Sequence, residues 1–109
     1  MKTKLNALQS RTLALLQELA RDPDLAEADP ATGDVRLTAL PHAHGDHVHI
    51  GARVVSSRHA SGLDNANVWA ALARKGLVGA GYPFELVITA AGLAFDTGLR
   101  GGLTAPTDH

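Results

Sequence analysis

The sequence predicts a single small α+β domain, with an antiparallel β-hairpin between an N-terminal helix and a second helix. Three observations lead to this fold class. Leucines recur at helical spacing over residues 4–21, apolar and polar residues alternate over 35–40 and 47–55, and helical spacing returns at 65–75. A chain of 109 residues can bury one modest core, so these elements belong to one domain.

The first predicted helix covers residues 4–21. Thr3 is a suitable N-cap, because a hydroxyl can accept a hydrogen bond from an exposed amide of the first turn. Pro23 ends the helix, since the proline ring does not fit a helix interior. The apolar stripe is too short for a coiled coil and predicts core packing instead. It consists of Leu5, Leu8, Leu13, Leu15, Leu16 and Leu19.

A turn and a hairpin are expected next. Residues 25–28 form a short strand, and the turn at 29–34 contains Gly33, which tolerates a positive φ. Alternating apolar residues predict strands at 35–40 and 47–55. The six residues between them cannot hold a parallel crossover, so we expect these two strands to pair as an antiparallel hairpin.

The second half of the chain predicts a helix, a strand and a short final helix. Asp64 is the expected N-cap of a helix at 65–75, and Gly76 is a natural residue just after its C-terminus. Residues 84–89 are predicted to form another strand. Thr89 then caps the last helix.

Composition limits the classes of site and partner. The chain has no cysteine, which excludes disulfides and thiolate metal sites. No apolar run approaches the roughly 20 residues of a membrane span, and no signal-peptide segment opens the chain, so we expect a cytoplasmic protein without a membrane partner. A second copy of the chain or another protein stays open as a partner. The globular domain is expected over residues 1–103, with a flexible tail at 104–109.

Four histidines and an aspartate fall within eight residues, in the string HAHGDHVH. Imidazole and carboxylate are favoured ligands of divalent transition metals, here zinc or nickel. Residues two apart on a strand share a face, and Gly45 gives the adjoining loop freedom to fold back. The sequence therefore predicts a metal site, with an unoccupied polar hairpin tip as the alternative. The candidate ligands are His42, His44, Asp46, His47 and His49.

The spacing of His42, His44, Asp46 and His47 resembles the first metal-binding motif of the metallo-β-lactamase superfamily, His-x-His-x-Asp-His. The resemblance implies zinc ions that activate water for hydrolysis. In that family the motif leads into a helix, whereas this sequence continues with strand-like alternation. The family's fold is longer than this chain, and its further ligands have no counterpart that we can place. A metal-dependent hydrolase is therefore the third hypothesis.

Residues 62–95 resemble the second half of bacterial winged-helix domains. A helix ending in Arg-Lys-Gly-Leu-Val is followed by a strand ending in Val-Ile-Thr. The resemblance implies a recognition helix and a wing, and hence a DNA-binding transcriptional regulator as the alternative function. No basic residue lies within 65–73 or in the wing. The candidate DNA contacts are Asn65, Asn67, Arg74 and Lys75.

As a whole the chain resembles a family of small uncharacterised bacterial proteins with a leucine-rich helix, a histidine-rich hairpin and a winged-helix-like C-terminal half. That resemblance implies no activity. We expect a non-enzymatic binding or regulatory module that holds a divalent metal through its histidine-rich hairpin, and no catalytic residues are assigned.

Overall fold

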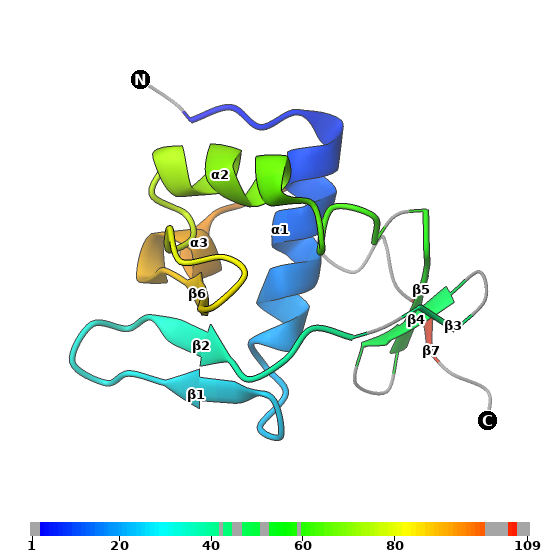
Figure 1. The fold of residues 1–109 in the computed structure, drawn as a ribbon, viewed down its shortest axis with the longest axis horizontal. Helices are drawn as coiled ribbons and strands as arrows, with labels where there is room; N and C mark the ends of the chain where they lie inside the picture. Colours follow the sequence, from blue (N-terminus) through cyan, green and yellow to red (C-terminus); the bar gives the residue numbers. More distant parts are fainter. Residues whose placement is uncertain are drawn as a thin grey trace.

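The computed structural model contains, within its described part, three helices and two antiparallel sheets (Figure 1). The small α+β domain that the sequence predicts is therefore confirmed at the level of fold class. The described residues are 3–41, 43–44, 47–50, 53–58, 60–99 and 105–106.

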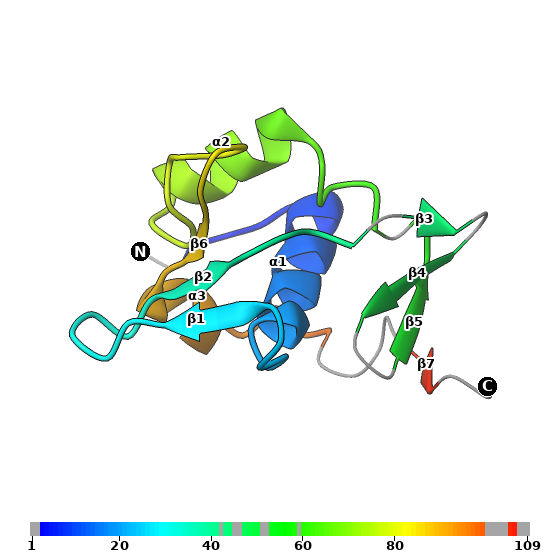
Figure 2. The same cartoon turned by 60° about the horizontal axis from the view of Figure 1, so that its bottom comes forward.

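Helix α1 (Ala7–Leu19) passes through the middle of the fold, with the other elements around it (Figures 1 and 2). Its N-cap is Asn6, whose Oδ1 accepts the Gln9 amide at 2.8 Å, while the Gln9 Oε1 accepts the Asn6 amide at 3.1 Å. This reciprocal pair satisfies two amides that an uncapped helix would leave without partners. The predicted cap at Thr3 was therefore wrong, and the helix starts later than residue 4.

The first sheet consists of β1 (Ala26–Ala28), β2 (Val35–Leu37) and β6 (Leu86–Ile88), in the order β1-β2-β6 and antiparallel throughout. The turn between β1 and β2 uses Gly33 at a φ of 79°, as predicted. Val35 and Leu37 are buried and Arg36 between them is exposed, so the predicted alternation holds in β2.

The second sheet carries most of the histidine-rich segment. Its order is β3-β4-β5-β7, again antiparallel, and it lies beside α1 on the side away from α3 (Figures 1 and 2). Val48 and Val55 form a directly opposed pair on one face of this sheet and are both buried. The strands are β3 (Ala43–His44), β4 (His47–Ile50), β5 (Arg53–Ser56) and β7 (Ala105–Pro106).

The predicted pairing of residues 35–40 with 47–55 was wrong, and the single strand predicted over 47–55 is instead the antiparallel pair of β4 and β5. β2 pairs with β1 along one edge and with β6 along the other, so neither of its edges is available to β4. β4 instead lies between β3 and β5. Residues 41–46, expected as a loop, include strand β3. Of the residues expected to form a C-terminal tail, 105–106 pair with β5 and the rest lie outside the described residues.

Helices α2 (Ala66–Arg74) and α3 (Ala90–Ala94) complete the fold. α2 is capped by Asn65, one residue after the predicted Asp64, and Gly76 follows its C-cap at a φ of 75°. Thr89 caps α3 as predicted, with its hydroxyl accepting the Gly92 amide at 3.0 Å.

One core joins the two sheets and the helices. Leu16 from α1, Leu72 from α2 and Ile88 from β6 are fully buried in the same cluster that contains Val48 and Val55 from the second sheet. Within the described part of the chain, no helix is long and apolar enough to cross a membrane.

Candidate functional site

The backbone of β3 and β4 brings three of the candidate histidines together. His44 is the direct partner of His47 across the β3–β4 pair, and His49 lies two residues further along β4. Directly opposed residues of an antiparallel pair share a face of the sheet, as do residues two apart on one strand. His44, His47 and His49 are therefore on one face, opposite the face of Val48.

The spacing of these backbone positions suits a shared ligand. In antiparallel sheets, opposed Cα atoms are about 4.5–5.5 Å apart, and residues two apart on a strand are separated by about 6.5–7 Å. Imidazole nitrogens carried on such a triangle of positions can reach one ion, because zinc–nitrogen bonds are about 2.0–2.1 Å long.

The remaining candidate ligands, His42 and Asp46, lie outside the described residues. Among the residues that the structure describes, no three histidine, cysteine, aspartate or glutamate side chains form a group that could hold a metal ion. The metal site therefore stays a prediction, based on the backbone register of β3 and β4.

In the metallo-β-lactamase superfamily, the motif that this sequence resembles leads into a helix. In this fold two motif residues, His44 and His47, lie instead on the paired strands β3 and β4, and β5 follows. The described helix nearest after the motif is α2, which begins at Ala66. The local setting of the motif thus differs from the one that the resemblance implies.

Two of the candidate DNA contacts have structural roles. The Asn65 Oδ1 accepts the amides of Asn67 at 3.0 Å and Val68 at 3.4 Å, which caps α2. The Lys75 ammonium donates to the carbonyl of Lys4 at 2.6 Å and to the Gln9 Oε1 at 3.2 Å, which ties the end of α2 to the start of α1.

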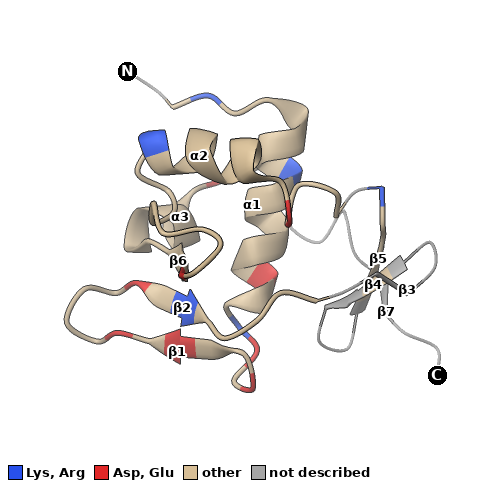
Figure 3. Ribbon diagram, viewed as in Figure 1, with Lys and Arg blue, Asp and Glu red and all other residues tan. Residues whose placement is uncertain are grey.

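Asn67, Arg74 and Lys75 are all exposed, and of these three only Lys75 donates a side-chain hydrogen bond to another described residue. Cationic residues are dispersed among the elements in Figure 3 rather than gathered along α2. The loop that would act as a wing joins Gly79 to Val87 through a backbone hydrogen bond of 2.9 Å and carries the almost fully exposed Phe84.

Acidic residues gather on β1 and the turns that flank it (Figure 3). Glu27 pairs with Arg36 across β1 and β2 at 2.8 Å, and this hydrogen bond and its charge raise the pKa of Arg36 above its ordinary value. Asp34 accepts the Ala90 amide at 2.9 Å, so it joins β2 to the start of α3. These contacts give the acidic residues structural roles.

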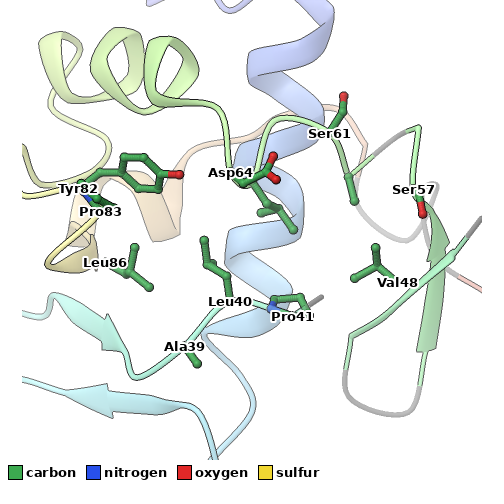
Figure 4. A pocket seen from close by; sticks show the side chains of 12 residues that line it. Ala39, Leu40, Pro41, Val48, Ser57, Ser61, Asp64, Tyr82, Pro83 and Leu86 are labelled. Carbon is green, nitrogen blue, oxygen red and sulfur yellow. The ribbon is translucent and has the colours of Figure 1, made fainter. Parts of the chain in front are cut away.

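A pocket between the two sheets was not predicted from the sequence (Figure 4). Its lining comes from four separate segments: the residues after β2, strand β4, the turns before α2, and the loop around Tyr82. No local motif marks such a site, because only the tertiary fold brings the segments together. The sequence signal that exists is weak: Asp64 and Tyr82 are polar residues beside apolar ones.

Comparison of the chain with models of protein families, with curated proteins and with solved structures finds no match. The assignment of function therefore depends on the chain's own residues and geometry.

Proposed function

We propose that this chain is a non-enzymatic binding or regulatory module that holds a divalent metal ion, zinc or nickel, on the β3–β4 pair. The observation that carries the proposal is the register in which His44 opposes His47, with His49 on the same face of β4. Three positions for nitrogen ligands then lie within the reach of one ion.

The rest of the coordination shell follows from the chemistry of the neighbouring residues. In the sequence, His42 directly precedes β3 and Asp46 falls between β3 and β4. Either can supply a fourth ligand, and Asp46 can alternatively accept a hydrogen bond from a ligating imidazole. A shell of nitrogen and carboxylate ligands favours zinc or nickel over calcium or magnesium.

Calorimetric titration of chelator-treated protein with zinc and with nickel tests this function. We expect one ion per chain with an affinity in the micromolar range or tighter, and at least about tenfold weaker binding for His47→Ala and for His49→Ala. His109→Ala is the matched control, since it removes an imidazole outside the cluster. A metal affinity that is only millimolar, or one that His47→Ala and His49→Ala leave unchanged, would refute a metal function.

The stoichiometry of the same titration separates the metal hydrolase from the binding module. Two ions per chain, with turnover of an ester or phosphodiester that Asp46→Ala abolishes, would favour the hydrolase. One ion per chain without turnover supports the module.

The alternative function is DNA binding by a winged-helix-like half formed by α2, β6 and the hairpin between them. Exposed Asn67 and Arg74 on α2 support it. It predicts salt-dependent binding to duplex DNA that weakens when Arg74 and Lys75 are both replaced by alanine, with Lys2→Ala as the control for loss of charge. Absence of binding at low salt would exclude this alternative.

A further inference from the structure

The pocket between the two sheets has the size and lining of a small-molecule site. It encloses about 420 Å³, within the range of about 300–1,000 Å³ that ligand sites occupy. Leu40, Val48, Leu63 and Leu86 contribute apolar side chains to its wall, and these four come from four separate segments of the chain (Figure 4).

Asp64 and Tyr82 are two of the polar residues that line the pocket. In Figure 4 the hydroxyl of Tyr82 points toward Asp64, whose carboxylate points away from Tyr82. Neither group forms a hydrogen bond or an ion pair with another described residue. Among the described residues that line the pocket, none is lysine or arginine. The pocket therefore combines an apolar wall with a single charged group, which is negative.

We propose that this pocket binds a small primary amine with an apolar body. The ammonium lies against the Asp64 carboxylate, which can accept its hydrogen bonds. The apolar body lies against Leu40, Leu86 and the Tyr82 ring, where leaving water is favourable. An anion of the same shape is repelled by Asp64, and a neutral analogue lacks the charge-assisted hydrogen bond.

Occupancy of the pocket can be followed through Trp69. The indole stacks on Tyr82 with ring centroids 5.0 Å apart and an angle of 18° between the rings. Its Nε1 donates to the Leu63 carbonyl at 2.8 Å, and Leu63 also lines the pocket. Two walls of the pocket thus contact the single tryptophan of the chain, so a ligand that shifts either wall changes its fluorescence.

The experiment titrates the 109-residue chain with 2-phenylethylamine, 2-phenylethanol and 3-phenylpropionate, in buffer containing a chelator. Trp69 fluorescence reports binding and calorimetry confirms it. We expect saturable binding of the amine, at least about tenfold tighter than that of the alcohol, and no binding of the carboxylate. Asp64→Asn should reduce the affinity for the amine to that for the alcohol.

Two further variants make the outcome decisive. Asp24→Asn removes an exposed carboxylate in the turn after α1 and should leave the affinity for the amine unchanged. Ala39→Phe fills the pocket from an exposed position and should abolish binding of both probes. No saturable binding of the amine up to about 10 mM, equal affinity for amine and alcohol, or an affinity that Asp64→Asn leaves unchanged would overturn the proposal. Because the chelator removes metal, a failure here is independent of the metal function.

Discussion

Gly92 lies where the backbone of α3 closely approaches the backbone of Leu77. It is buried in α3, its amide donates to Thr89, and its carbonyl accepts the Gln17 side-chain amide at 2.9 Å. A Cβ built on Gly92 would overlap the backbone carbonyl of Leu77, which cannot move without disturbing its hydrogen bond from Thr89. The absence of a side chain is therefore what allows α3 to approach the segment after α2.

Replacement of Gly92 by alanine should lower the free energy of unfolding by about 2–3 kcal/mol, the cost of overpacking a buried position. Gly76→Ala is the matched control. Gly76 has a φ of 75° with no atom near its Cβ position, so its cost is backbone strain of about 1–2 kcal/mol. Urea unfolding followed by Trp69 fluorescence measures both variants. A cost for Gly92→Ala that is smaller than that for Gly76→Ala would contradict the close approach of α3.

At the scale of elements, helix caps decide where the helices begin. Asn65→Ala removes the oxygen that accepts the Asn67 and Val68 amides, and should destabilise the protein by about 1 kcal/mol. Asn67→Ala, two residues later, removes no intramolecular side-chain acceptor of an amide and should be neutral within about 0.5 kcal/mol. Thermal unfolding followed by circular dichroism compares them. Equal effects of the two substitutions would show that Asn65 is not the cap.

The sequence predicts where the helices and strands lie along the chain better than it predicts which strands pair with one another. The leucine stripe of α1, the alternation in β2, the turn at Gly33 and the cap at Thr89 are local signals, and each is confirmed. The N-caps at Asn6 and Asn65 were missed because a polar residue that can cap a helix lies nearby in each case, Thr3 and Asp64. Only the hydrogen bonds that form distinguish such neighbours.

Strand pairing and the candidate sites depend on information that is not local. Alternation in 35–40 correctly marks β2, but it does not say that β6, about fifty residues away, occupies the free edge of that strand. Alternation in 47–55 suggested one strand, whereas the structure has two, β4 and β5, which pair with each other. The cluster HAHGDHVH made the candidate metal site visible in the sequence, but the position of His44 on strand β3 was not predicted. The pocket of Asp64 and Tyr82 was not, because its walls meet only in the folded chain.

At the scale of the whole molecule, the two sheets share one core. Val48 and Val55 of the second sheet belong to the same buried cluster as the leucines of α1 and the indole of Trp69. The second sheet therefore gains its stability from contact with α1 rather than from its short strands alone, since small isolated sheets are marginal in water. Unfolding of either sheet should expose the same core.

This shared core predicts a single unfolding transition. Val55→Ala should destabilise the whole protein by about 2 kcal/mol, because it leaves a cavity in the shared core, and should lower Tm by roughly 8–12 °C. Val54→Ala, on the opposite and half-buried face of β5, is the matched control and should cost less.

The measurement records Trp69 fluorescence and far-ultraviolet circular dichroism during the same thermal unfolding experiment. Trp69 lies in α2, far along the chain from β5, so coincident shifts of both signals indicate one cooperative unit. A circular dichroism transition that moves while the Trp69 transition stays in place would mean that the second sheet unfolds on its own.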